Sequence, residues 1–226
     1  MKKILYIFLL GFTANSLFAQ ATTFETSLDS DPEATIILDA LKMKYDAYAS
    51  ATYNFNIDIE IPGQGMESPD GRYVQKGEKF VLYFGDQEIY NDNETLWIYD
   101  TSVNIVQVYD ANFDDEGAFM SPAEFLEIYK ADDYSYAIVN EWYEQQTVMK
   151  HIDFKPLDKD SDFFKVRLEL KGKNNDINLV KVFAKDGSRY TLRIKDIVSN
   201  ERIEDDFFVF DANNYENIQI ENLRID

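Results

Sequence analysis

The sequence of 226 residues contains no cysteine and a single histidine, His151. Without cysteine the chain forms no disulfide, so the hydrophobic core has to stabilise the fold unaided. The chain also lacks the thiol through which a bacterial lipoprotein receives its acyl anchor. Zinc and copper sites require several histidine or cysteine ligands. We therefore expect no metal ion and no other cofactor.

Positive charge is scarce in this chain. It carries 22 Lys and Arg residues against 42 Asp and Glu residues, which gives a formal net charge of −20 at pH 7. Phosphate binding requires clustered basic side chains, so nucleic acid is excluded as a partner. Docking on anionic lipid headgroups is disfavoured for the same reason. The excess of acidic residues favours a soluble protein.

Long apolar runs are absent except at the N-terminus. Lys2 and Lys3 precede the apolar residues 4–12, and Ala19 ends the segment. This order is typical of a secretory signal peptide, and the apolar part is too short to span a bilayer as a stable helix. We expect cleavage near Ala19. We expect a single domain over residues 20–226, because no linker rich in Pro, Gly or Ser interrupts it.

Motifs that would indicate catalysis are also missing. The sequence has no GxSxG, P-loop or dinucleotide-binding glycine pattern. His151 lies in a strand pattern without an obvious nucleophile. Asp158, Asp160 and Asp162 have the spacing of a calcium loop, but Phe163 stands where that loop needs glycine. We expect no catalytic residues and no enzyme, and a hydrolase with an unrecognised acidic pair is the least favoured alternative.

A helical pattern follows a polar start over residues 20–32, which we expect to be flexible. Apolar residues at i, i+3, i+7 and i+10 predict an amphipathic helix that begins at Pro32. Asp31 is the expected cap, and proline suits the first turn. The apolar residues of this helix are Leu38, Leu41, Tyr45 and Tyr48.

A second, shorter helix is expected after Pro122. Phe125, Leu126 and Tyr129 give it an apolar side. A short apolar helix between strands is unusual in a β-rich chain, so we interpret it as a cover over one open end of the core.

Strand patterns fill most of the remaining chain. From Tyr53 to Ile61 apolar and polar residues alternate, which is typical of a half-buried strand. Further strands follow from the same alternation and from turn signals such as Asp186-Gly187. We expect about eleven strands in all. They are Tyr53–Ile61, Arg72–Gln75, three short runs within Lys79–Tyr109, Tyr134–Val139, Gln146–Phe154, Phe163–Leu170, Ile177–Ala184, Arg189–Lys195 and Phe207–Phe210.

The stretch from Lys79 to Tyr109 departs from this alternation. Its three strand runs are apolar or aromatic on both faces, as in the four residues 96–99 (LWIY). A strand with one solvated face should alternate apolar and polar residues. Both faces of these strands must therefore be covered, either by further protein or by an apolar ligand.

Many consecutive strands linked by hairpins predict one large antiparallel sheet, and such a sheet usually coils into a barrel or half-barrel. We predict a mainly β fold of the α+β class. It is a single unclosed antiparallel β-barrel of about eleven strands with a helical lid. The two helical segments are the expected covers of its apolar concave face.

Several short motifs resemble a known family in their order and spacing. They are Gly71-Arg72-Tyr73-Val74, the strand at Phe80, Asp92-Asn93-Glu94-Thr95-Leu96-Trp97-Ile98-Tyr99, Val106-Gln107-Val108, the helix after Pro122, Phe154-Lys155-Pro156, Asp186-Gly187 and Phe208-Val209-Phe210. Over residues 33–212 the chain resembles the periplasmic outer-membrane lipoprotein carrier family (LolA-like). Its hairpin ending at Asp100 is similar to that family's DGKTLWxYxP-type signature. The acidic loop 110–117 and the tail 213–226 diverge.

The resemblance implies a hydrophobic cavity for lipoprotein acyl chains, in a monomer located in the periplasm of a Gram-negative bacterium. The implied partners are lipoproteins, an inner-membrane ABC transporter that releases them, and an outer-membrane acceptor. In that family an arginine before the strand at Phe80 helps to hold the lid closed. Here Lys76 takes its place, and lysine keeps the charge but loses the planar donor group. Because it lacks the anchor cysteine, the chain resembles the soluble shuttle of that family rather than the anchored receptor.

We expect the acyl chains to contact apolar side chains of the sheet and of the helices, with Lys76 as a lid contact. The candidate residues are Leu38, Leu41, Phe55, Ile57, Ile59, Phe80, Leu82, Phe84, Leu96, Trp97, Phe125, Leu126 and Tyr129. A register shift of one residue exchanges the two faces of a strand, so which set lines the cavity stays open. Each candidate could equally belong to an ordinary core. The alternative function is a non-catalytic envelope interaction module with a filled β-sandwich core.

Overall fold

The computed structural model describes residues 26, 29–111, 126, 128–130 and 133–224, and every structural statement refers to these residues. They form one α-helix, α1 (Pro32–Asp46), and twelve strands of one sheet. The strands are β1 (Ala51–Glu60), β2 (Asp70–Lys76), β3 (Lys79–Phe84), β4 (Gln87–Asn91), β5 (Thr95–Asp100), β6 (Ile105–Asp110), β7 (Tyr134–Glu144), β8 (Thr147–Pro156), β9 (Phe163–Lys171), β10 (Asp176–Ala184), β11 (Arg189–Ser199) and β12 (Gln219–Asn222). Two short 3₁₀ helices, η2 (Asp205–Phe208) and η3 (Ala212–Asn214), lie between β11 and β12.

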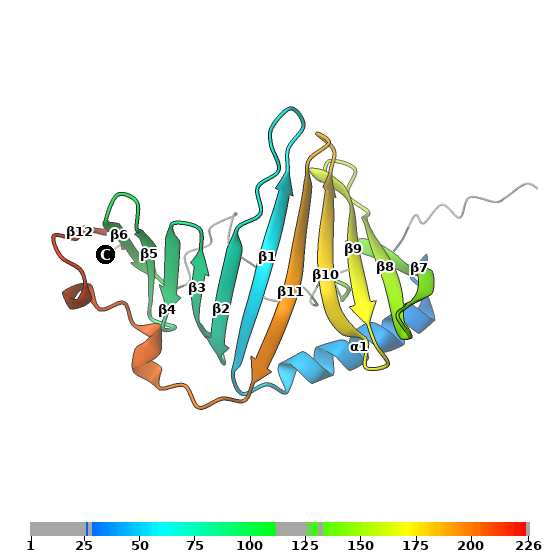
Figure 1. Cartoon of the computed structure of the whole chain (residues 1–226), viewed down its shortest axis with the longest axis horizontal. Helices are drawn as coiled ribbons and strands as arrows, with labels where there is room; N and C mark the ends of the chain where they lie inside the picture. The colour runs from blue at the N-terminus through cyan, green and yellow to red at the C-terminus, as the bar shows by residue number, and fades with distance from the viewer. Residues whose placement is uncertain (1–25, 27–28, 112–125, 127, 131–132, 225–226) are drawn as a thin grey trace, which may run out of the picture.

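The described strands follow the order β12-β6-β5-β4-β3-β2-β1-β11-β10-β9-β8-β7 across the sheet. All neighbours pair antiparallel except β12, which pairs parallel with β6. Because β12 and β7 remain separate edges, the sheet curls without closing (Figure 1). The predicted unclosed β-barrel with a helical lid is confirmed. The described residues form one sheet rather than the two sheets of a sandwich.

The first predicted helix is confirmed as α1. Asp31 Oδ1 accepts a hydrogen bond from the Glu33 amide at 2.9 Å, and Pro32 occupies the first turn, where its missing N–H is no loss. The helix crosses β7 to β10 and leads into β1 (Figure 1). We call the sheet face that carries α1 the concave face and the opposite face the convex face. The helix residues buried against the concave face are Ala34, Ile37, Leu38, Leu41 and Tyr45.

The main core lies between α1 and the concave face. It is one cluster built from alternate residues of the strands, because every second side chain of a strand points to the same face. In β8 and β9, for example, Ile152 lies opposite Leu168 and Phe154 lies opposite Val166, and all four are buried. The core therefore occupies one face only in this half of the sheet.

The C-terminal segment, residues 201–224, covers the convex face of β2 to β6. Phe208 is fully buried in a cluster with Val74 and Val81. Phe210 packs with Tyr99 and Val106 in a second cluster. The apolar strands between residues 79 and 109 thus have the C-terminal segment on one face, and the other face belongs to the concave side. On the convex face these strands are therefore covered by protein where the C-terminal segment contacts them.

The strand predicted at Phe207–Phe210 is wrong. Asp205–Phe208 forms η2, and the Val209 amide donates to the Asp206 carbonyl at 3.2 Å to close the turn. The spacing of the aromatic residues is typical of a strand, but Phe208 and Phe210 are instead buried against the convex face. The strand forms later, as β12 beside β6, and β4 is a further strand that the pattern did not separate.

The second predicted helix lies largely outside the described residues. Of its apolar side, Leu126 and Tyr129 are described; both adopt a turn and are buried in the concave cluster. Within the part of the chain that is described, no helix is long and apolar enough to cross a membrane.

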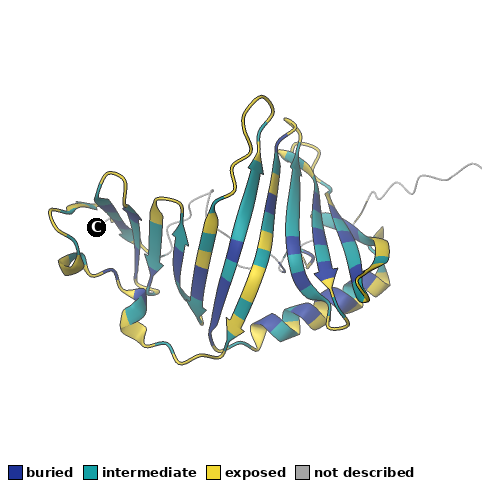
Figure 2. Ribbon diagram, in the orientation of Figure 1, coloured by how far each residue is buried: buried dark blue, intermediate teal, exposed yellow. Residues whose placement is uncertain are grey.

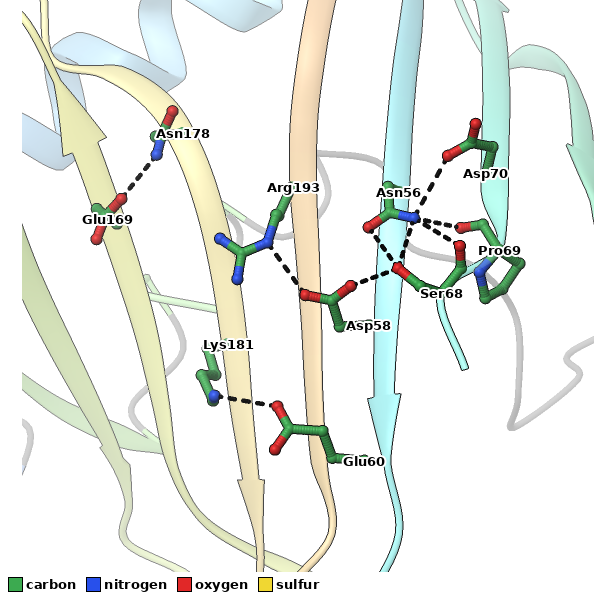
Figure 3. Close-up of polar contacts among 10 residues, drawn as sticks. All are labelled: Asn56, Asp58, Glu60, Ser68, Pro69, Asp70, Glu169, Asn178, Lys181 and Arg193. Carbon is green, nitrogen blue, oxygen red and sulfur yellow. Dashed lines mark hydrogen bonds and ion pairs between the residues drawn. The ribbon is translucent and has the colours of Figure 1, made fainter. Parts of the chain in front are cut away.

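The convex face of β1 and β9–β11 is polar and carries cross-strand contacts (Figure 3). Arg193 Nε donates to Asp58 Oδ2 at 3.1 Å, and Ser68 Oγ donates to Asp58 Oδ1 at 2.6 Å. The Ser68 hydrogen bond, together with Arg193, lowers the pKa of Asp58. Lys181 Nζ lies 3.5 Å from Glu60 Oε1. Exposed residues recur along β11 (Figure 2), so this part of the convex face is solvated.

Candidate functional site

A row of apolar side chains crosses five adjacent strands on the concave face. Pairing places Tyr53 opposite Tyr73, Tyr73 opposite Leu82, Leu82 opposite Ile89, and Ile89 opposite Ile98. Residues that lie opposite one another in an antiparallel sheet share a face. The row therefore extends the apolar surface of the concave face from the strands near α1 out to β5.

Most predicted site residues lie on this concave face. Leu38, Leu41, Phe55, Leu82, Leu126 and Tyr129 are buried in its cluster, and Ile57, Phe80 and Phe84 are half-buried against it. Leu96 is buried and lies in line with Phe80, since Asn91 pairs with both. Ile59 is half-buried two residues beyond Ile57 on β1. Phe125 lies outside the described residues. That these side chains contact acyl chains stays a prediction.

Two predicted site residues lie on the convex face instead. Trp97 packs against the cluster of Tyr99 and Phe210, beneath the C-terminal segment. Lys76 Nζ donates to the Ile203 carbonyl and to Asp205 Oδ1, both at 2.7 Å. Lys76 thus fastens the C-terminal segment in this structure, and its partners among the described residues do not include α1. Alternation along β2 and β5 is the physical reason, because neighbouring residues of a strand point to opposite faces.

A glycine allows two aromatic rings to meet over β2. A Cβ atom on residue 71 would lie 2.2 Å from Phe55 Cζ, so only Gly71 leaves room for the Phe55 ring. The ring then stacks on Phe84, with centroids 6.2 Å apart and an interplanar angle of 25°. The side chains of β1 and β3 are joined across the intervening strand, which makes the apolar surface continuous.

The concave interior offers little chemistry beyond apolar contact. The buried polar side chains among the described residues are Ser, Thr and Asn, without a buried carboxylate, lysine, arginine or histidine. Burial raises the pKa of the Tyr45 and Tyr53 phenols, so both stay neutral. The Tyr53 hydroxyl has no hydrogen-bond partner among the described residues. A neutral interior of this kind suits an uncharged ligand.

Polar contacts at the edges fasten α1 over the concave face. Thr35 Oγ1 lies 3.0 Å from the Tyr136 hydroxyl, and the Tyr136 carbonyl accepts from the Asp31 amide at 2.8 Å. The Tyr129 hydroxyl donates to Asp39 Oδ1 at 2.6 Å, which joins the turn at residues 128–130 to the helix. These contacts lie at the rim, so the helix meets the strands themselves mainly through apolar side chains.

His151 lies on the convex face, away from this surface. Its Nε2 is 2.8 Å from Glu169 Oε2, and its ring lies edge-on to Trp142 with centroids 4.5 Å apart. Asn178 donates to the other oxygen of Glu169 at 2.7 Å (Figure 3). The described part of the chain holds no group of three or more His, Cys, Asp or Glu that could bind a metal ion.

Sequence reasoning missed several residues of the concave face. Ile89 and Ile98 extend the apolar row, and Tyr73 links it to β1. Ile89 sits in β4, whose polar neighbours obscure the strand pattern. The signal that could have found it is the register of the β3–β4 hairpin, where Gly85 adopts a positive φ of 58°.

Comparison with known proteins identifies the family. Residues 71–211 match the sequence profile described as "Outer membrane lipoprotein carrier protein LolA". No curated protein is detectably similar to the chain in sequence.

Solved structures are similar to the chain at low sequence identity. An uncharacterized conserved protein from Thermus thermophilus is 10% identical, with a TM-score of 0.53 over 84% of this chain and 99% of that one. A LolA superfamily protein from Nitrosomonas europaea is 13% identical, with a TM-score of 0.41 over 78% and 97%. A putative outer membrane lipoprotein-sorting protein domain from Vibrio parahaemolyticus is 11% identical, with a TM-score of 0.41 over 78% and 96%.

Proposed function

Because the chain belongs to the family of outer-membrane lipoprotein carrier proteins LolA, we propose that it binds the acyl chains of lipoproteins on its concave face. In this proposal the mature protein is a periplasmic shuttle. It receives lipoproteins released by an inner-membrane ABC transporter and delivers them to an acceptor at the outer membrane. It acts by binding and release, without catalysing a reaction.

The observation that carries the proposal is the extent of the apolar concave face. Helix α1 crosses β7 to β10 (Figure 1). The pairing of the strands shows that the apolar row continues to β5. Ile89 in that row is only half-buried, and so are Phe80 and Phe84, which lie on either side of Leu82 on the same face of β3. Apolar side chains that stay partly exposed beside a neutral core are suited to bind a further apolar group.

The energy of acyl-chain burial is sufficient for this function. Each buried CH₂ contributes about 0.8 kcal/mol, so a chain of some fifteen carbons gains on the order of 10 kcal/mol before the costs of binding. The site must also release its cargo. An open sheet with a helix fastened mainly at its rim can separate from its ligand more readily than a closed barrel.

A direct test measures binding of a fluorescently labelled diacylated lipopeptide to the protein lacking residues 1–19. The control ligand is the same peptide without acyl chains. We expect the acylated peptide to bind and the control peptide not to bind. Equal binding of both peptides, or of neither, would falsify the proposal.

Variants locate the binding surface. Phe84→Asn places an amide among the half-buried residues of the concave face and should weaken lipopeptide binding by at least about tenfold, because one apolar ring contributes roughly 1.5–3 kcal/mol. Ile220→Asn is the matched control, since Ile220 is exposed on β12 at the far edge. Circular dichroism should show that both variants fold. Release of lipoprotein from inner-membrane vesicles then tests the shuttle: the wild type should release it and Phe84→Asn should not.

A further inference from the structure

A second candidate site lies on the convex face at the opposite end of the sheet, and it is independent of the proposed acyl-chain surface. A groove of about 400 Å³ runs over β7, β8 and the start of β9. Its apolar floor includes Ala137, Val139 and Phe164, and its rim includes Lys155 and Lys165. We call it the β7–β9 groove.

The groove exposes apolar side chains next to the part of the convex face, over β9–β11 and β1, that carries mainly polar side chains. Val139 is 51% exposed and Phe164 is 45% exposed. Phe163, the neighbour of Phe164, packs into the concave core. Phe164 and Lys165 both lie against Phe183 on the convex face, because a β-bulge in the pairing of β9 with β10 interrupts the strand alternation there. Large apolar side chains exposed together in a hollow are typical of an interaction site.

An unpartnered hydroxyl lies in the wall of the same groove. Ser135 is 1% exposed, and its Oγ has no hydrogen-bond partner among the described residues. A buried hydroxyl without a partner costs free energy that a ligand atom can recover. This hydroxyl is a second observation, separate from the exposed apolar residues, that indicates a ligand with a hydrogen-bonding group.

Basic side chains gather around an aromatic ring beside the groove. The cations of Lys165 and Lys181 lie 4.2 and 5.7 Å from the centre of the Phe183 ring, and those of Arg167 and Arg189 lie 5.9 and 5.1 Å from it. Phe183 in turn lies 6.0 Å from Phe164, centroid to centroid. These four cations and Phe183 form what we call the Phe183 cluster.

The Phe183 cluster and the groove hold more positive than negative charge. Lys165 and Arg167 share one carboxylate, Asp153, at 3.3 and 2.6 Å. Arg189 donates to the backbone carbonyls of Ala184 and Ser188. Among the described residues no carboxylate lies within salt-bridge distance of Arg189 or Lys155, although the charge of Arg189 helps to lower the pKa of Asp186, after the hydrogen bonds of Ser188. Such an excess is notable in a chain of net charge −20.

We propose that the β7–β9 groove binds a short, extended acidic segment of a partner protein. Carboxylates of the segment pair with Lys155 and Arg189, and its apolar side chains pack on Val139 and Phe164. A backbone or carboxylate oxygen accepts the hydrogen bond of Ser135. The local positive charge selects an acidic ligand, and the hollow shape admits a single chain. A flat anionic bilayer cannot enter the groove and would face the acidic remainder of the molecule.

The test uses a fluorescein-labelled decapeptide of alternating glutamate and leucine, with serine–leucine and lysine–leucine decapeptides as controls. Anisotropy should show binding of the glutamate peptide only, weakening as salt rises. Arg189→Gln and Phe164→Ser should each weaken binding at least about fivefold, since each removes one charge-assisted or one apolar contact. Lys173→Gln, in the exposed hairpin at the far end of β9, should leave it unchanged.

Several results would overturn this proposal. They are no binding of the glutamate peptide at about 1 mM, equal binding of the serine peptide, or unchanged affinity in both groove variants. Capture of the protein by phosphatidylglycerol vesicles that depends on Arg189 would assign the groove to a membrane instead. A dimer in sedimentation that Phe164→Ser dissociates would assign it to a second copy of the chain. Lipopeptide binding should be the same in wild type and groove variants, so failure here leaves the proposed carrier function standing.

Discussion

Truncation of Phe208 tests whether the C-terminal segment is an integral cover of the sheet. Phe208 is fully buried against Val74 and Val81. Burial of an aromatic side chain removes about 150–250 Å² from water, which at about 25 cal/mol per Å² corresponds to roughly 4–6 kcal/mol. Measured Phe→Ala changes in protein cores fall at about 3–5 kcal/mol. We therefore expect Phe208→Ala to cost about 3–5 kcal/mol of docking free energy.

This loss is local, because the segment can detach while the rest of the sheet stays folded. Its other fastenings include the ion pairs of Asp205 with Lys76 and Lys79, and exposed pairs of that kind contribute at most about 1 kcal/mol each. The ring contacts of Phe210 with Tyr99 and Tyr215 remain as the second anchor. In Phe208→Ala the C-terminal segment should therefore detach often while the main core stays folded.

Hydrogen exchange with mass spectrometry measures this opening. In Phe208→Ala the amides of β12, Gln219–Asn222, should exchange at least about a hundredfold faster, since about 1.4 kcal/mol corresponds to a factor of ten. Amides of β8 and β9 should keep their rates. The control is Val209→Ala, because Val209 is 42% exposed beside Phe208. Unchanged exchange of β12, or equal acceleration in β8, would refute the assignment of the segment as a separately docked cover.

Three further substitutions test the interior and one ion-pair group. Gly71→Ala brings a Cβ atom 2.2 Å from the Phe55 ring and should cost about 1–3 kcal/mol in urea unfolding; a cost under about 0.5 kcal/mol would contradict the close packing. Tyr53→Phe removes a buried, unpartnered hydroxyl and should raise the melting temperature, whereas a decrease would show that the hydroxyl has a partner. Burial opposes a low pKa of Asp153, but the hydrogen bonds and charges of Arg167 and Lys165 hold it below its usual value. The contribution of the Asp153 carboxylate to stability is therefore complete above about pH 4 and is lost as the pH falls through its lower folded-state pKa. Asp153→Asn should be less stable than the wild type at pH 7 and should lose less stability on acidification. Parallel stability profiles of the two proteins against pH would rule this out.

Local patterns were sufficient to predict α1 and most strands. Asp31 and Pro32 fix the start of the helix by capping and by the fixed φ of proline, and both effects act within a few residues. The alternation from Tyr53 onward predicts β1 because burial on one face repeats every second residue. The C-terminal segment could not be predicted in this way. Its aromatic anchors bury against strands more than a hundred residues away, and no local pattern encodes that contact.

The sequence predicts which residues of each strand share a face, but it does not predict which of the two faces is the concave one. Alternation shows that Leu96 and Trp97 point to opposite sides, yet it does not say which side α1 covers. The structure resolves this through pairing: Leu96 falls in line with Phe80 on the concave face, and Trp97 packs under the C-terminal segment. Lys76 follows the same logic, because it shares its face with Val74.

Helix α1 and the C-terminal segment cover different parts of the two faces of the sheet, and two apolar surfaces remain partly exposed outside them. Helix α1 protects the concave face of β7 to β10, and the C-terminal segment protects the convex face of β2 to β6 (Figure 1). The concave face of β3 to β5 and the convex face at the β7 edge lie outside these two covers. The first is a half-buried neutral surface, and the second is a groove with basic side chains on its rim. The two proposed ligands, an apolar chain and an acidic segment of a partner protein, therefore have separate places, and we expect both to bind at once.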